Sequence, residues 1–246
     1  MLIMKNSITA IVFAIAIIIA SVVLGNAFMN RNKAQRTIAV TGLGSSDFTS
    51  DLIVWEANFS RTNENLQQAY KDLENDKTVI STYLTTKGVS AEQMVFSAVN
   101  SSEMTEPNYG PNGNYIGSTF KGYSLTQNVE INSTNVAEIE KISREITELL
   151  NRGVKLYSSA PRYYYTKIED LKVEMISRAT ENARLRAERI AENSGSNLGE
   201  LIDAKMGIFQ ITGQNSGEDY SWGGAYNTSS KEKTTSITMK LTYSVD

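Results

Sequence analysis

The first thirty residues constrain this chain most, because they contain a long apolar run that begins at Ile8 and ends at Leu24. Lys5 precedes the run, and Thr9 and Ser21 are its only polar members. Apolar side chains surround the whole circumference of such a helix, so it has no polar face to turn toward water. We therefore expect residues 1–30 to form a hydrophobic helix that inserts into a membrane. The residues expected to contact the bilayer are Ile8, Ile11, Val12, Phe13, Ile15, Ile17, Ile18, Ile19, Val22, Val23 and Leu24.

The length of the run lies between that of a signal-peptide core and that of a minimal membrane-spanning helix. The small residues of Gly25-Asn26-Ala27 favour cleavage, whereas the long apolar core favours an uncleaved anchor. Arg31, Lys33 and Arg36 follow the run and argue for a cytoplasmic body on a count of positive charges. Lys5 and the free amine, which precede the run, favour the opposite orientation. We expect the body on the periplasmic side of the cell envelope, anchored in the inner membrane, or secreted if the segment is cleaved.

Two absent residue types limit the chemistry of the body. The chain has no Cys and no His, which excludes Ser-His-Asp and Cys-His nucleophilic systems and the usual zinc sites. Its net charge of −3 gives no basic surface for nucleic acid. We therefore expect no catalytic residue, no cofactor, no metal ion and no nucleic-acid partner.

The body begins after a short polar linker at residues 31–36 and occupies residues 37–246. Apolar residues alternate with polar ones in several segments, as they do in half-buried strands. The clearest is the last, where Ile237, Met239, Leu241, Tyr243 and Val245 alternate. Expected strands lie at 38–40, 53–59, 95–100, 123–131, 154–157, 201–210 and 237–245, with a turn at Gly42 to Ser45.

Three segments place apolar residues three or four apart and predict amphipathic helices. They are residues 63–87, 136–149 and 167–193, and glycines follow each of them. In the last, Ala179, Ala183, Ala187 and Ala191 recur every four residues, so this helix can pack closely against a neighbour. The pattern predicts an α+β fold in which an antiparallel sheet carries three long packed helices.

Three segments of the body resemble the SIMPL-domain family over about residues 37–245. They are Thr37-Ile38-Ala39-Val40-Thr41-Gly42-Leu43-Gly44, Gly122-Tyr123-Ser124-Leu125-Thr126, and the helix segment 179–191. The resemblance implies helices packed on antiparallel sheet, a periplasmic location, and assembly into ring-like oligomers in some relatives. Relatives include a periplasmic immunogenic protein, an envelope protein linked to oxidative-stress tolerance and an animal protein that binds a signalling kinase. None is established as an enzyme. Ser50-Asp51 stands where Pro-Asp is common in the family.

Three short motifs suggest chemistry but lack its context. Gly42-Leu43-Gly44 lacks the third glycine and the following helix of a dinucleotide loop. Ser230-Lys231-Glu232-Lys233 has the Ser-x-x-Lys spacing of penicillin-interacting enzymes, but it leads into a strand. Asp72, Glu74 and Asp76 have the spacing of calcium ligands, but they lie within a helical pattern, and we expect a solvated helix face.

Two glycine-rich segments carry exposed-type aromatic residues and are the candidate interaction loops. Tyr109 and Tyr115 lie in the loop expected at 107–117, and Tyr220, Trp222 and Tyr226 lie in that expected at 212–230. Tyr and Trp offer a large apolar area with a polar group, which suits protein contacts. The leading hypothesis is a non-enzymatic exported envelope protein that self-associates or binds a protein partner, with a role in envelope or oxidative-stress tolerance. The alternative is a periplasmic small-ligand binding module that uses these loops.

Overall fold

The computed structural model describes the backbone of residues 2–31 and 36–246, and the side chains of residues 13–28 and 36–246. The chain divides into two compact units, each described by itself. The first unit comprises Met1–Gly42, Asn182–Lys205 and Lys240–Asp246, and the second comprises Leu43–Glu181 and Met206–Met239.

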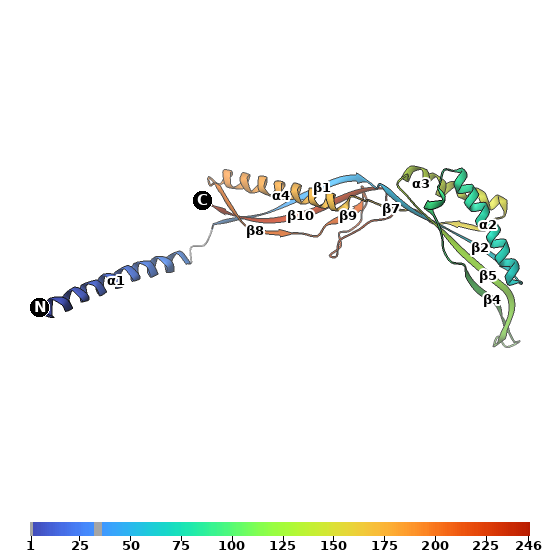
Figure 1. The fold of residues 1–246 in the computed structure, drawn as a ribbon, viewed down its shortest axis with the longest axis horizontal. Coiled ribbons are helices and arrows are strands. Elements are labelled where there is room, and N and C mark those ends of the chain that lie inside the picture. The colour runs from blue at the N-terminus through green and yellow to red at the C-terminus, as the bar shows by residue number, and fades with distance from the viewer. Residues whose placement is uncertain (1, 32–35) are drawn as a thin grey trace. The chain divides into compact units, whose positions relative to one another are not determined.

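The N-terminal segment forms helix α1, Leu2–Arg31, as expected (Figure 1). Its described side chains, from Phe13 to Phe28, are all exposed. The side chains of Ile8, Ile11 and Val12, which the sequence places among the bilayer contacts, lie outside the described residues. Among the described residues, the structure has no helix that is both long enough and apolar enough to cross a membrane.

One sheet has four strands in the order β1-β10-β8, with β9 paired to β10 (Figure 1). Its strands are β1 (Thr37–Thr49), β8 (Leu198–Met206), β9 (Gln210–Gly213) and β10 (Glu232–Val245). Helix α4 (Ile168–Asn193) buries its alanine positions completely, as the spacing predicts. The turn expected at Gly42 to Ser45 is wrong, because β1 continues through it.

Gly44 lies where strand β1 passes very close to helix α4. A Cβ added there would lie 2.2 Å from the carbonyl oxygen of Met175 and 3.0 Å from the backbone nitrogen of Ala179. The backbone of β1 thus approaches that of α4 more closely than a side chain allows. Gly42-Leu43-Gly44 therefore serves helix-on-strand packing and forms no phosphate loop.

The second sheet has six strands and contains β5, the longest strand among the described residues. Its order is β3-β5-β2-β6, with β4 paired to β5 and β7 paired to β2, and these pairings are antiparallel. The strands are β2 (Leu52–Asn63), β3 (Met94–Phe96), β4 (Asn100–Tyr109), β5 (Tyr115–Ser133), β6 (Leu156–Ser158) and β7 (Arg162–Tyr164).

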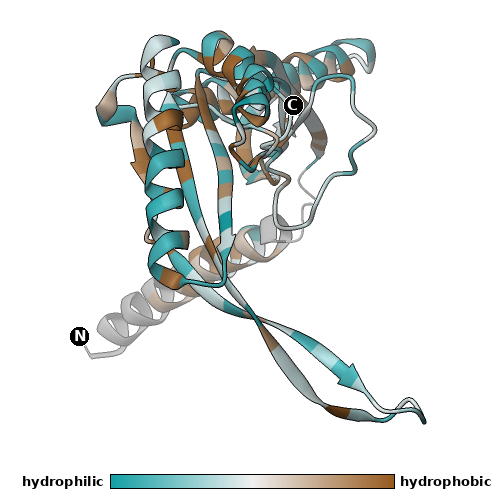
Figure 2. Cartoon of the chain, turned by 90° about the vertical axis from the view of Figure 1, so that its right-hand side faces the viewer, coloured by the Kyte–Doolittle hydropathy of each residue, from teal (hydrophilic) through white to brown (hydrophobic). Residues whose placement is uncertain are grey.

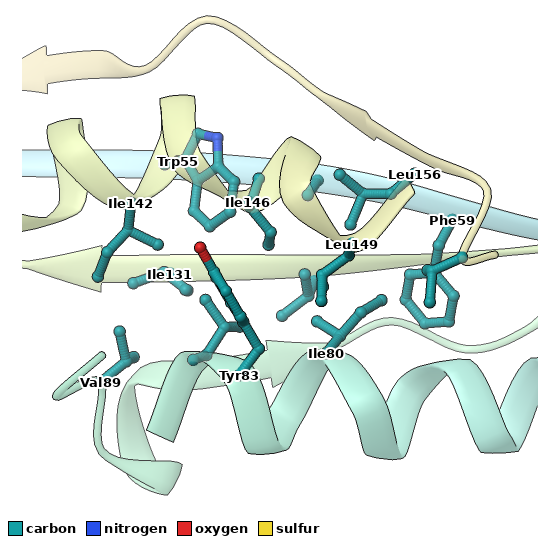
Figure 3. Packing of buried hydrophobic residues seen from close by; sticks show 14 of the residues in the cluster. Trp55, Phe59, Ile80, Tyr83, Val89, Ile131, Ile142, Ile146, Leu149 and Leu156 are labelled. Carbon is teal, nitrogen blue, oxygen red and sulfur yellow. The ribbon is translucent and has the colours of Figure 1, made fainter. Parts of the chain in front are cut away.

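Helices cover one face of this sheet and enclose the main core (Figure 3). They are α2 (Leu66–Thr86), α3 (Val136–Glu145) and the 3-10 helix η2 (Ile146–Arg152), while the short 3-10 helix η1 (Ala91–Gln93) precedes β3. Trp55 and Phe59 of β2 are fully buried in this core, together with Ile80 of α2 and Leu149 of η2 (Figure 3). Burial of apolar area on this scale is the main stabilising term of such a unit.

The expectation of three long helices is not confirmed. Two helices, α2 and α4, are long, but α3 has only ten residues. The chain continues as η2, which ends at Gly153 in the left-handed conformation. The tighter 3-10 turns still bury Ile146 and Leu149 in the core. The apolar spacing that predicts one long helix is therefore found in two consecutive helices, α3 and η2.

Asp76 is also placed differently from the solvated helix face that the sequence predicts. Its side chain is 3% exposed and forms a bidentate ion pair with Nε and Nη2 of Arg61. The same Nη2 donates to the carbonyl oxygen of Gly153 at 2.8 Å. The hydrogen bond with Asp76 raises the pKa of Arg61 above its usual value. Asp76 therefore connects α2 to β2 and does not resemble a calcium ligand.

Candidate functional site

The hairpin of β4 and β5 extends beyond the part of the sheet that helices cover (Figure 2). The pairing of β5 with β2 ends at Tyr123, which faces Asn63. At the next residue, Gly122, φ is +131° and an added Cβ would lie 2.7 Å from the carbonyl oxygen of Asn63. A register shift between Met104 and Thr105 marks a β-bulge at the same level. Bulges increase the local twist, so the strands leave the sheet here as a two-stranded ribbon.

We call this ribbon, residues 104–121, the arm. Its register pairs Thr105 with Phe120, Pro107 with Ser118 and Tyr109 with Tyr115. Side chains of successive pairs alternate between the two faces of a ribbon. One face therefore carries Pro107, Tyr109, Tyr115 and Phe120, and we call it the aromatic face. The opposite face is polar, and there Asn108 Nδ2 donates to Thr119 Oγ1 at 2.9 Å.

The aromatic face is open to water. Tyr109 and Tyr115 are each 63% exposed and their rings contact edge to face, with centroids 6.3 Å apart. Phe120 is 46% exposed and packs only against the ring of Tyr123, at 5.2 Å, among the ring contacts of the described residues. Ile116, at the second register shift, is 68% exposed. The arm thus presents an uncovered apolar surface.

The long loop expected at 107–117 is wrong in its extent, since only residues 110–114 connect the strands. Of the glycines that predict a loop, Gly110 and Gly113 lie in this connection, whereas Gly117 is accommodated by a bulge. Gly117, like Gly122, has a positive φ, and it lies beside the second register shift. Pro107 is tolerated in β4 because it lies in a two-stranded ribbon, where an outer edge needs no amide hydrogen.

The second aromatic segment, residues 214–231, forms the rim of an open groove in the second unit. The groove has a volume of about 390 Å³. Its lining residues are Leu43, Gly207, Ile208, Gln210, Tyr220, Ser221, Trp222, Ser236, Ile237 and Thr238. Tyr220 and Trp222, two residues of the expected interaction loop, therefore both line this groove, and the lining includes no residue of the arm.

The side chain of Gln210 fixes the loop above the groove. Its Oε1 accepts hydrogen bonds from the backbone nitrogens of Ser221 and Ala225, at 3.3 and 2.6 Å, and its Nε2 donates to the carbonyl oxygen of Ser221 at 2.8 Å. Tyr226 forms a parallel bridge with Ile211 and does not line the groove. Trp222, between these fixed points, is 96% exposed. The loop is thus tied down at its base and presents the indole ring to solvent.

The groove carries no charged side chain, although a charged network lies at the other end of the loop. Asp47 accepts hydrogen bonds from Thr234 Oγ1 at 2.6 Å and from Gln214 Nε2 at 3.0 Å. These bonds lower the pKa of Asp47, with Thr234 the larger cause. The network connects β1 to β10 and to the start of the loop, so it holds the loop and leaves the groove neutral.

Lys233, from the Ser-x-x-Lys segment, is buried and bound to neither Ser230 nor a carboxylate in the described structure. Its Nζ donates to Ser50 Oγ at 2.9 Å and to the carbonyl oxygen of Tyr163 at 2.6 Å. Burial lowers the pKa of Lys233 to about 8. Ser50 and Lys233 are only 3% and 2% exposed, so this Ser-Lys pair has no route for a substrate and holds the turn between β1 and β2.

The polar floor of the groove is a part of the site that the sequence analysis missed. Ser236 and Thr238 flank Ile237 in β10, and all three line the groove. Thr238 is exposed, whereas Ser236 is only 8% exposed. Because alternate residues of a strand face opposite sides, the pattern could have identified Thr238 as an outward-facing hydroxyl. It does not identify Ser236, which is buried next to the buried Thr235 and Ile237. Ser236 and Thr238 line the same groove as Trp222 because the loop leads back into β10, which no local pattern shows.

Comparison with known proteins identifies the family to which the body of the chain belongs. Among curated proteins, none matches the chain. The family model of SIMPL, described as a protein of unknown function (DUF541), matches residues 38–246. This match covers most of the chain and includes both sheets, the arm and the groove. The chain therefore belongs to the SIMPL family.

Proposed function

We propose that this protein is a non-enzymatic component of the cell envelope that is held at a membrane by its N-terminal segment and self-associates through the arm. A supporting role in envelope or oxidative-stress tolerance follows from the relatives that the sequence resembles. The missing Cys and His residues and the inaccessibility of the Ser50 and Lys233 pair support a role without catalysis.

The aromatic face of the arm is the observation that carries this proposal. An isolated two-stranded ribbon is marginally stable in water, and exposed aromatic residues on one face add apolar surface that nothing in the described residues covers. The polar face is satisfied by its own contacts, including the ion pair of Lys121 Nζ and Glu106 at 2.6 Å. A partner is therefore expected on the aromatic face alone.

A second copy of the chain fits this face best. Two arms related by a twofold axis would bring the same aromatic residues of each copy together, which makes the contact self-complementary. Rings that meet edge to face or offset are favourable, and the Tyr109–Tyr115 pair already has this geometry within one arm. Pairing would convert two marginal ribbons into a two-layered unit with a buried apolar interior.

Size-exclusion chromatography with light scattering, on the full chain in detergent, tests the proposal. We expect the wild type to be oligomeric and the Tyr115→Ser/Phe120→Ser variant to be monomeric, because the double change removes most of the aromatic face. The matched control, Thr119→Ser, changes the polar face of the same strand and should leave the assembly intact.

Two results would contradict self-association through the arm. One is a wild-type chain that stays monomeric at high concentration. This result would contradict self-association even if the arm were found to bind a different protein. The other is an oligomer that persists in the double variant with unchanged mass. Circular dichroism of the two variants verifies that both retain the folded body. We expect this because the arm contributes no residue to the main hydrophobic core.

A further inference from the structure

We propose that the groove beneath loop 214–231 binds a neutral saccharide, with a sugar ring stacked on Trp222 and its hydroxyl groups bonded to Ser236 and Thr238. This proposal does not depend on self-association, because the groove and the arm share no lining residue.

The lining of the groove excludes a charged ligand. None of its residues is acidic or basic, and the charged Asp47 is engaged by Thr234 and Gln214. Phosphate and carboxylate ligands need Arg, Lys or several backbone amides for recognition. The chemistry of this groove therefore suits a ligand without formal charge.

Trp222 provides the stacking surface. It is 96% exposed, whereas the other tryptophan, Trp55, is fully buried. A large apolar ring held in water costs free energy unless a ligand covers it. Since Gln210 fixes the loop backbone at Ser221 and Ala225, on either side of Trp222, the loop loses little conformational freedom when a ligand covers the ring. The C–H face of a pyranose ring has the flat apolar shape that such an indole accepts.

Ser236 and Thr238 provide the polar contacts. Within the described part of the chain, neither hydroxyl has a side-chain hydrogen bond, while the neighbouring Thr235 Oγ1 donates to the carbonyl oxygen of Gln210 at 3.1 Å. Gly207 gives the hydroxyl of Thr238 room, because a Cβ added there would lie 2.3 Å from Thr238 Oγ1. Ser and Thr hydroxyls both donate and accept, as do the hydroxyls of a sugar.

These hydroxyls also distinguish a saccharide from a purely apolar ligand. Leu43, Ile208 and Ile237 could contact an acyl chain. However, an acyl chain over Ser236 and Thr238 would take water from two hydroxyls without replacing its hydrogen bonds, which is unfavourable. A saccharide satisfies the apolar and the polar part of the groove together. The volume of about 390 Å³ lies within the range of small-molecule sites.

Isothermal titration calorimetry on the full chain tests the proposal, in a zwitterionic detergent so that no sugar headgroup competes. The probes are chitotetraose, cellotetraose and maltotetraose, with lauric acid as the apolar probe. We expect at least one saccharide to bind and to change the fluorescence of Trp222. Because Trp55 is buried, a change in the exposed fraction of emission reports on the groove.

Variants assign the binding to the groove. Trp222→Ala should abolish measurable saccharide binding, and Thr238→Val should weaken it about tenfold, the loss expected for one hydrogen bond. Tyr157→Ala is the matched control, because Tyr157 is equally aromatic and 69% exposed but lies outside the groove. The Tyr115→Ser/Phe120→Ser variant should bind the saccharide as the wild type does, so failure of self-association leaves this result interpretable.

Three outcomes would overturn the saccharide site. In the first, none of the three saccharides binds. In the second, a saccharide binds but Trp222→Ala retains wild-type affinity. In the third, lauric acid binds in the groove and displaces every saccharide, which would identify an apolar ligand site instead.

Discussion

Lys233 is the residue whose environment is most unusual, because its ammonium group is buried with only neutral partners in the described structure. Ser50 Oγ and the carbonyl oxygen of Tyr163 accept its hydrogen bonds, and burial lowers its pKa to about 8 from the usual value of 10.5. Below about pH 8 the folded and unfolded states both carry the proton, and the cost of burying the charge is present in full. As the pH rises toward 10.5, only the unfolded state retains the proton, so stability increases.

We therefore expect the free energy of unfolding to rise by about 2 kcal/mol from Lys233 alone between about pH 7.5 and pH 9.5. Burial raises the pKa of Tyr83 and Tyr163, which reduces stability above about pH 10, so the window ends below that value. Urea denaturation of the wild type and of Lys233→Met at both pH values measures the difference. The wild-type rise should be absent from the variant, and equal pH dependence of the two proteins would contradict the buried, uncompensated charge.

The sequence could not predict these partners at the scale of single residues. Asp76 lies in a pattern that predicts a solvated helix face, and Lys233 in a Ser-x-x-Lys spacing that leads into a strand, yet both residues are almost fully buried. Asp76 is buried because Arg61, in β2, lies opposite it, and Lys233 because Ser50 and Tyr163 come from two distant segments. Burial of a polar group depends on a partner brought by the tertiary fold, and spacing along the chain contains no such information.

At the scale of elements, α4 and β1 show how a small residue sets the distance between a helix and a strand. The expected result of Gly44→Ala is a loss of about 3 kcal/mol of unfolding free energy, because its Cβ would overlap the backbone of Met175 and Ala179. Gly217→Ala is the matched control, since an added Cβ there meets nothing within 4 Å, and it should change stability by less than about 0.5 kcal/mol. Equal stability of the two variants, measured by urea denaturation, would show that β1 and α4 are farther apart.

The elements that the sequence predicted well are those with an uninterrupted pattern. Alternation identified β2, the inner half of β5 and β10, and the alanine spacing identified the buried face of α4. The outer part of the arm, residues 107–117, was predicted as a loop because its glycines have the composition of a turn. Gly110 and Gly113 do lie in the connection between the strands, whereas Gly117 lies at a bulge. Candidate aromatic residues could thus be listed from the sequence, but their division between an arm and a groove required the strand register.

At the scale of the whole molecule, the family match begins at residue 38 and leaves the N-terminal segment as a separate question. The charges around that segment conflict, because Lys5 precedes the apolar run while Arg31, Lys33 and Arg36 follow it. An envelope protein requires the body to cross the membrane despite the three later charges. The orientation of the chain therefore decides whether the proposed envelope role is possible.

A topology reporter at the C-terminus measures this orientation. We expect a fused alkaline phosphatase to be active, because that enzyme forms its disulfides only outside the reducing cytosol, and a fused β-galactosidase to be inactive. If the segment is an uncleaved anchor, the fusion should remain in the membrane fraction after an alkaline wash, whereas an Ile15→Glu/Ile19→Glu variant should lose this retention, since charges within the apolar run oppose insertion. The control, Asn26→Gln, alters the chain beyond the run and should leave retention unchanged. An active β-galactosidase fusion would place the body in the cytosol and contradict the proposed envelope role. Any ligand or protein that binds the arm or the groove would then be cytosolic.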